Sequence, residues 1–181
     1  MTAFEAAFAD VLAGVPDEHF DRERFVPGVG SFDADVMLVG EAPGGNEVKR
    51  GEPFVGQAGQ QLNRILEDLE IAREDLYITN LVKVRPPENR DPYVDEIASW
   101  WPVLEAELDR VDPDVLVPLG SFATQEVLDT DETITDLRGE EFEPDGRLVR
   151  PTFHPAAALY DRSKLPRITD DLKRALARSD G

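Results

Sequence analysis

Three side chains that could hold a flat heterocyclic ring stand at or near the ends of short apolar runs. Phe54 lies in a glycine-rich stretch, Asn80 lies near the end of one apolar run, and His154 directly follows another. A phenyl ring can stack on a ring face, and an asparagine amide offers both a donor and an acceptor to an imide edge. An imidazole can donate a hydrogen bond to a carbonyl oxygen that gains negative charge. This set suits an extruded nucleobase better than a hydride-transfer cofactor or a phosphate ester.

Each of these residues taken alone has a purely structural interpretation. Phe54 could plug a loop, Asn80 could cap a turn by bonding to neighbouring backbone, and His154 could be a structural histidine before a proline. Their common place at strand ends is what favours a binding site, because ligands of open α/β sheets bind beyond the carboxyl ends of the strands.

The apolar runs predict the strands that must position these side chains. They lie at 35–40, 76–82, 114–120 and 147–153. The first and third are continuous and end in glycine, which is typical of buried parallel strands. Helical patterns are expected at 57–71, 91–111, 121–130 and 167–179, and Pro102 should kink or divide the second of them.

Alternation of strands and helices predicts an α/β protein, a three-layer αβα sandwich around a mostly parallel sheet of about four strands. We expect a single domain over residues 1–181, with residues 1–24 as an N-terminal helical arm packed on the core. The glycine-rich stretch at 40–56 is neither a P-loop nor a dinucleotide fingerprint. A plain nucleotide-binding domain is therefore disfavoured.

The charge of the chain is strongly acidic, with 38 Asp and Glu against 19 Lys and Arg and a net charge of −19. Only four of the basic residues are lysine, and acids occur along the whole sequence. This pattern predicts a halophilic protein, whose self-repulsion is screened where the Debye length falls to about 3 Å in molar salt. Screening also blunts the argument that such a charge excludes nucleic acid.

The composition excludes several function classes. Without cysteine the chain can form no disulfide, no cysteine nucleophile and no cysteine-ligated zinc or iron–sulfur site. Two histidines make a histidine-rich metal site implausible, so no metal is expected. No apolar stretch approaches the roughly 20 residues that span a bilayer, and the N-terminus lacks the basic region of a signal peptide. A cytoplasmic monomer without membrane contact is expected.

Several motifs in order make the sequence resemble the uracil-DNA glycosylase superfamily, and within it family 4, the thermophilic and archaeal type. These are "DADVMLVGEAPG", "GEPFVGQAGQQL", "LYITNLVKVRPPENRDP", "VLVPLGSFAT", "TDLRG" and "PTFHPA". The resemblance runs from about Phe25 to the C-terminus. It implies a DNA repair enzyme that hydrolyses the N-glycosidic bond of flipped-out uracil and leaves an abasic site, with uracil-containing DNA as its partner.

The resemblance also implies roles for the pocket residues. Uracil would stack on Phe54, Asn80 would read its O4 and N3–H, and His154 would stabilise O2 as the base leaves as an anion. Cytosine would be rejected because its donor and acceptor are reversed, which leaves buried groups unpaired.

The loop after the first predicted strand resembles the water-activating motif of the family. Some glycosylases carry an aspartate where this chain has Ala42, which leaves the handler of the water open between Glu41 and Glu47. We take Glu41 as the catalytic candidate, and place it with Ala42 among the uracil-binding residues. Glu47, Gly40 and Gly44 are expected to order the loop.

Contacts with DNA are expected from local basic groups and one apolar wedge. The candidates near the pocket and in the "TDLRGE" and "HPAAALYDRSK" loops are Lys83, Arg85, Arg90, Arg138, Leu159 and Arg162. Leu159 or its neighbour Tyr160 could enter the gap left by the flipped base; an incidental apolar residue in a surface loop is the equal alternative.

The chain departs from family 4 in its cofactor. Typical members ligate an iron–sulfur cluster with four cysteines, and here the two downstream positions hold Val84 and Trp100. No cofactor is therefore expected, and an apolar plug should fill the volume, because an empty cavity would be costly. Two alternatives stay open, a glycosylase for another deaminated base such as hypoxanthine or xanthine, and a non-catalytic binder of DNA lesions.

Overall fold

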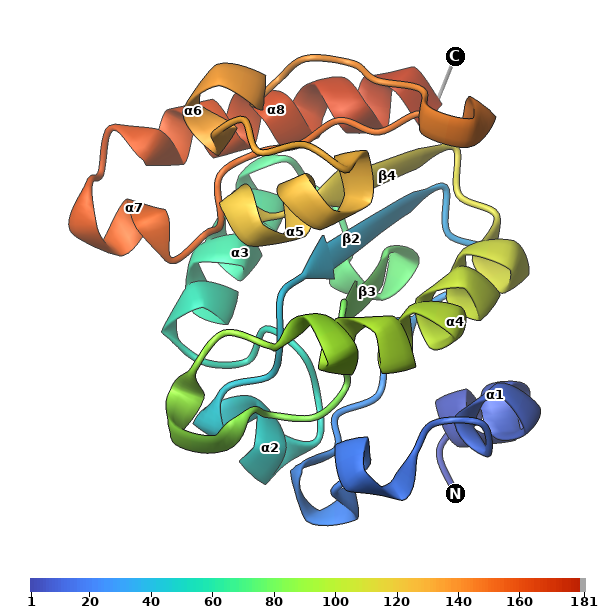
Figure 1. Cartoon of the computed structure of the whole chain (residues 1–181). Helices are drawn as coiled ribbons and strands as arrows, with labels where there is room; N and C mark the ends of the chain where they lie inside the picture. Colours follow the sequence, from blue (N-terminus) through green and yellow to red (C-terminus); the bar gives the residue numbers. More distant parts are fainter. Residues whose placement is uncertain (180–181) are drawn as a thin grey trace.

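The computed structural model describes residues 1–179 and has a four-stranded sheet at its centre (Figure 1). The strands are β1 (Val29–Gly30), β2 (Val36–Gly40), β3 (Tyr77–Asn80) and β4 (Val115–Pro118), in the order β1-β3-β2-β4. β2 pairs in parallel with both β3 and β4, and the short β1 is antiparallel to β3. The mostly parallel sheet is confirmed.

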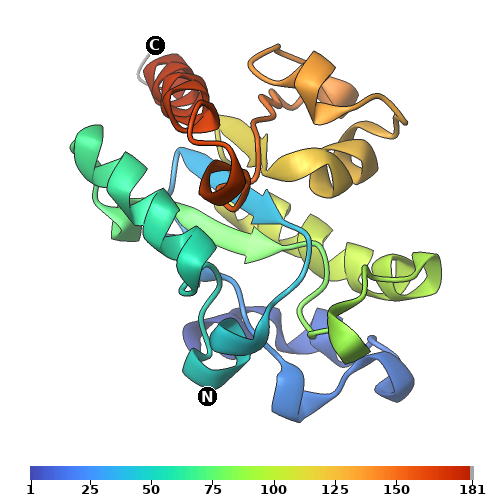
Figure 2. The ribbon, with the colours of Figure 1, turned by 90° about the vertical axis from the view of Figure 1, so that its left-hand side faces the viewer.

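Helices cover both faces of the sheet, so the three-layer αβα sandwich is confirmed (Figure 2). Val36 and Leu38 of β2 belong to a core shared with α3 (Gln57–Asp68) and α8 (Lys164–Ser179). Met37 and Val39 belong to a second core shared with α4 (Val94–Val111) and α5 (Gly120–Leu128). This alternation is the period of two that a strand with two buried faces requires.

Of the two predicted effects of Pro102, division into two helices is wrong, because α4 is one helix through this position. Both Pro102 and Ala98, whose carbonyl loses its helical donor, are exposed. Solvent can hydrate that carbonyl, which lowers the cost of proline inside the helix.

The predicted fourth strand at 147–153 is also wrong as a continuous strand. The segment runs parallel beside β4 but pairs at isolated bridges, Leu116 with Val149 and Leu119 with Thr152. Between these bridges lies Pro151, which has no N–H to donate to a ladder. The segment still ends at the carboxyl edge of the sheet, because the Gly120 N–H donates to the Thr152 carbonyl at 2.9 Å.

The N-terminal segment is helical and lies against α4. It comprises α1 (Ala3–Leu12) and two 3₁₀ turns, Asp17–His19 and Arg22–Arg24. Its buried side chains are Phe4, Phe8, Leu12, Val15 and Phe20, and they form one cluster with Ile97, Trp100 and Val103 of α4.

The remaining helices are short and lie around the carboxyl edge and the loops. They are α2 (Gly45–Arg50), α6 (Ile134–Leu137) and α7 (Ala157–Tyr160), with 3₁₀ turns at Arg73–Asp75, Pro87–Asn89 and Pro144–Gly146. Among the helices of residues 1–179, none combines the length and apolar character that a membrane crossing needs.

Candidate active site

The ring and the amide meet at Gly40, at the carboxyl edge of the sheet, and the imidazole lies beside the ring. Gly40 and Asn80 are partners in the β2–β3 register. A Cβ placed on Gly40 would lie 2.5 Å from Asn80 Oδ1 and 2.7 Å from Phe54 Cζ. Only glycine leaves space for both side chains at this position.

Phe54 is held in place by an unusual backbone and a close helix. Its φ is 53°, in the left-handed region that few non-glycine residues adopt. Helix α3 lies directly against its carbonyl, since a Cβ on Gly59 would come within 1.9 Å of that oxygen. The ring is 4% exposed, and its centroid lies 5.4 Å from that of His154 at an interplanar angle of 33°. The side chain therefore contacts both Gly40 and the imidazole region.

His154 is a neutral hydrogen-bond donor at neutral pH. The Ala156 N–H donates to its Nδ1 at 3.0 Å, so Nδ1 is the acceptor nitrogen and the ring proton is on Nε2. Burial lowers the pKa of the imidazole to about 4. The geometry thus fixes both the charge and the tautomer that donation to a carbonyl oxygen requires.

Glu41 follows β2 directly, half-buried beside the same edge. Burial, and then the hydrogen bond and the charge of Asp91, raise the pKa of its carboxyl group to about 8. Ala42, the next residue, borders the apolar cluster of the N-terminal segment. A carboxyl group with so high a pKa at a ligand edge is a candidate for proton transfer.

Glu47 lies in α2 between two glycine turns. Its Oε2 is 2.9 Å from the position of a Cβ on Gly44, and its Oε1 is 3.8 Å from that of a Cβ on Gly56. Gly44 is the N-cap of α2. The carboxylate is placed to order the loop that carries Glu41 and Phe54.

The prediction that Lys83 contacts DNA phosphates is wrong. The side chain is fully buried and forms an ion pair with Glu107, also fully buried. Because the Lys83 side chain points into the protein, its amino group cannot contact DNA.

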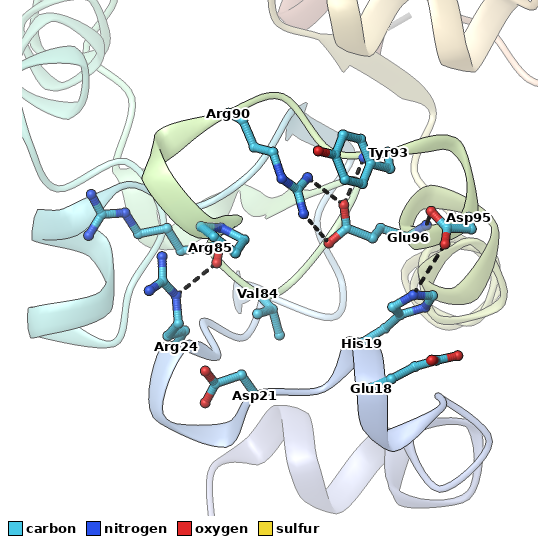
Figure 3. A pocket seen from close by; sticks show the side chains of 11 residues that line it. Glu18, His19, Asp21, Arg24, Val84, Arg85, Arg90, Tyr93, Asp95 and Glu96 are labelled. Atoms are coloured by element: carbon cyan, nitrogen blue, oxygen red, sulfur yellow. Dashed lines mark hydrogen bonds and ion pairs between the residues drawn. The ribbon is translucent and has the colours of Figure 1, made fainter.

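Arg85 and Arg90 lie at a cavity of about 320 Å³ beside the pocket (Figure 3). Arg90 donates to both Glu96 carboxylate oxygens, at 2.6 and 3.2 Å, and its guanidinium lies 3.6 Å from the centroid of the exposed Tyr93 ring. Arg85 donates through Nε to Asn89 Oδ1 at 2.7 Å. Of the two, only Arg90 already faces a carboxylate.

The "TDLRG" motif is tied to the segment that carries His154. Arg138 donates to both oxygens of Asp171, at 3.0 and 2.5 Å, and Thr152 Oγ1 donates to the same carboxylate at 2.6 Å. Through Asp171, Arg138 is thus connected to Thr152, which lies two positions before His154.

The last two residues of α7 present their side chains to solvent. Leu159 is 38% exposed and Tyr160 is 90% exposed, and Arg162 follows them on the surface. This is the exposed apolar projection near His154 that a wedge needs.

The two positions assigned to cluster ligands do not fit an iron–sulfur cluster. Trp100 is buried, stacks on Phe25 at an interplanar angle of 17°, and donates from Nε1 to the His19 carbonyl at 3.1 Å. Val84 packs against the same cluster. Within residues 1–179, no three His, Asp or Glu side chains are grouped to hold a metal ion. Both side chains thus pack in an apolar cluster, and Val84 also lines the cavity beside Arg85.

Sequence reasoning missed four residues that shape the site. They are Gly59, Asp91, Glu107 and Asp171. None of them is close to Glu41 or His154 in the sequence, because each belongs to a different segment of the chain, so local spacing could not single them out. A glycine inside the amphipathic pattern of α3 was a signal for Gly59, since glycine within a helix costs stability unless close packing requires it.

These features define a three-layer α/β protein whose candidate site lies at the carboxyl edge of its sheet. The chain belongs to the uracil DNA glycosylase superfamily, whose family profile matches residues 27–178.

Curated relatives agree with this assignment. The chain is 42% identical to a type-4 uracil-DNA glycosylase of Thermotoga maritima over 87% of this chain and 84% of the relative. It is 40% identical to a type-4 uracil-DNA glycosylase of Sulfurisphaera tokodaii, over 84% and 74%. A type-5 uracil-DNA glycosylase of Pyrobaculum aerophilum is 32% identical, over 85% and 76%.

Proposed function

We propose that the protein is a uracil-DNA glycosylase that hydrolyses the N-glycosidic bond of flipped-out uracil in DNA. The product is an abasic site, and no strand is cut. Membership of the superfamily and the type-4 relatives support the activity. The observation that carries the proposal is the meeting of Phe54 and Asn80 at Gly40, with the His154 ring 5.4 Å from that of Phe54.

Base recognition follows from the first two of these side chains. The uracil ring stacks on Phe54, and the Asn80 amide pairs with O4 and N3–H. Cytosine presents N4–H₂ and an unprotonated N3 instead, so an amide held in one orientation would face donor against donor and acceptor against acceptor. Each such mismatch leaves a buried polar group unpaired, and this excludes cytosine strongly.

Bond cleavage draws on His154. As the glycosidic bond breaks, the bonding electrons move to the base and negative charge gathers on O2. The Nε2–H of the neutral imidazole donates to that oxygen. Such a preorganised donor in a buried site is worth about 10²–10³ in rate.

Glu41 is the candidate for handling the attacking water. Only its ionised form can accept a proton from water, and its pKa of about 8 keeps much of it protonated at neutral pH. Excision should therefore accelerate as the pH rises towards 8 and then level off.

The DNA would lie over the edge that holds the pocket. Arg85 and Arg162 are the basic groups proposed to meet phosphates, and Leu159 to fill the gap left by the base. Asn80 and His154 would then form hydrogen bonds with the flipped base. The protein works without an iron–sulfur cluster, as a monomer of a salt-rich cytoplasm.

The test is excision from a uracil-containing oligonucleotide in about 2 M KCl, where the acidic surface is screened. Wild type would leave abasic sites, and Asn80→Ala would lose at least tenfold in kcat/KM while its circular dichroism spectrum is unchanged. Hypoxanthine and xanthine substrates run in parallel. A preference for either base would mean that the substrate is another deaminated base. Binding of uracil DNA without excision would mean that the protein is a non-catalytic binder of DNA lesions.

A further inference from the structure

A buried charged network contacts the backbone of Asn80. Lys83 Nζ pairs with the Glu107 carboxylate and donates to the Asn80 backbone carbonyl at 2.5 Å. The Tyr77 hydroxyl donates to the other Glu107 oxygen at 2.7 Å. Tyr77, Lys83 and Glu107 are each 0% exposed. We propose that this network positions Asn80 and thereby sets the preference for uracil, an inference that rests on the proposed function.

Stability alone does not account for a buried ion pair at this place. Removing two charges from water is costly, and well-packed apolar residues of similar volume are often as stabilising. Burial lowers the pKa of Lys83, and the neighbouring Glu107 carboxylate opposes that shift. What an apolar pair could not do is hold a particular carbonyl oxygen by a directional hydrogen bond.

The anchored carbonyl is the one that controls the reading amide. Asn80 is the last residue of β3, and the chain leaves the sheet immediately after it. The next N–H, of Leu81, donates to the Gly40 carbonyl at 2.9 Å. With both sides of the peptide group after Asn80 tied, its plane is fixed. The direction in which the Asn80 side chain leaves the backbone is then fixed as well. Specific recognition needs such placement to within about 0.5 Å.

The fold leaves space for the network at a glycine. A Cβ on Gly28 would come within 2.4 Å of Glu107 Oε2 and 2.5 Å of the Tyr77 hydroxyl oxygen. Gly28 precedes β1, and Val26 donates its N–H to the Lys83 carbonyl at 2.7 Å. The segment before the sheet thus closes the network from the side away from Asn80.

The experiment is a double-mutant cycle on uracil excision by the full chain. Lys83→Met keeps the length of the side chain and removes the charge. We expect it to lower kcat/KM for uracil at least tenfold and to lower the preference for uracil over cytosine. In the Asn80→Ala background the same change should cost less than twofold, because Lys83 acts through Asn80.

Two further variants separate positioning from stability. Leu76→Ala truncates a buried side chain at the opposite end of the same strand region. It should lower the melting temperature, and its effect on kcat/KM should be small and equal in both backgrounds. If Lys83→Met does not fold, the pair Lys83→Met with Glu107→Leu restores an apolar core without the carbonyl anchor. This folded double variant should still show the loss of rate and preference.

The outcomes distinguish the two proposals. If the folded double variant keeps the wild-type rate and preference while Asn80→Ala is impaired, the positioning role is overturned and the proposed function stands. Equal losses for Lys83→Met in both backgrounds also overturn it, since the residue would then act independently of Asn80. Failure of wild type to excise uracil overturns both proposals.

Discussion

Two neighbouring residues on one loop enter cores of opposite character. The Lys83 side chain points inward and joins a charged, hydrogen-bonded network that contacts Asn80. The Val84 side chain instead packs in an apolar cluster with Trp100 and the N-terminal segment. The first core contacts the carbonyl of a residue proposed to read the base. The second lies where the family resemblance implies a cluster. Buried polarity is kept where one orientation must be fixed, and an apolar filling suffices where only volume and stability are required.

The largest effect is expected on the apolar side. Trp100→Ala should remove about 3–5 kcal/mol of unfolding free energy, because it empties a buried volume between Phe20 and Phe25 and leaves the His19 carbonyl without its donor. Thermal unfolding in molar KCl measures it. At a temperature where the variant is folded, kcat for uracil should stay within about threefold of wild type. A loss of kcat comparable to that of a pocket variant would mean that the two cores are not separate.

The pocket side should show the opposite pattern. His154→Ala removes the Nε2–H donor, and kcat should fall by about 10²–10³ while the melting temperature changes little. Single-turnover excision measures the rate of the chemical step. His154→Gln is the matched control, since its amide can donate from a similar place and should recover part of the rate. Equal rates for the Ala and Gln variants would remove donation to O2 from the mechanism.

The division between the two cores explains what the sequence could predict. Short apolar runs predicted β2, β3 and β4, and the ends of the predicted strands singled out Phe54, Asn80 and His154 as candidates, because these predictions depend on short-range pattern and chain topology. The direction of Lys83 could not be predicted, since a lysine between two apolar runs is usually exposed. The inward orientation is possible because Glu107, a buried residue of α4, pairs with Lys83 in the tertiary structure.

The same limit applies to the strand at the edge and to Glu41. The run at 147–153 has strand composition, but Pro151 prevents continuous pairing, and two-residue β1 is too short for any periodicity. The pKa of Glu41 is raised by burial and then by Asp91, some fifty residues away, and neither the burial nor this neighbour can be predicted from the local sequence.

Glu41 gives a smaller effect, which depends on pH. The folded-state pKa of about 8 lies above the ordinary value of 4.5, so the native state binds this proton more tightly than the unfolded state does. The resulting stabilisation is full below about pH 4.5 and is lost as the pH rises through 8. Melting temperatures of wild type should therefore fall across this window, at roughly 2–4 °C for each kcal/mol lost.

Glu41→Gln tests this assignment, because a neutral amide removes the titration and should flatten the dependence between pH 5 and 8. Asp91→Asn should flatten it in part, since burial, the largest single cause of the raised pKa of Glu41, remains in that variant. The same two variants report on chemistry. If Glu41 handles the water, Glu41→Gln also abolishes the rise of excision rate with pH. An unchanged pH–rate profile in that variant would assign the water to another group.

The smallest effect is expected at the surface that would meet DNA. Arg162 is exposed beside α7, and Arg162→Ala should weaken binding of uracil DNA modestly and reduce the slope of log K against log salt by about one. Arg174 is a matched control, an exposed arginine on α8 that pairs with Asp170 at 3.3 Å. Arg174→Ala should leave both affinity and slope unchanged. Because both substitutions change the net charge of −19 equally, a long-range field would shift both variants alike. A change confined to Arg162→Ala would show that local contact with phosphate, and not the overall charge, governs DNA binding on this acidic surface.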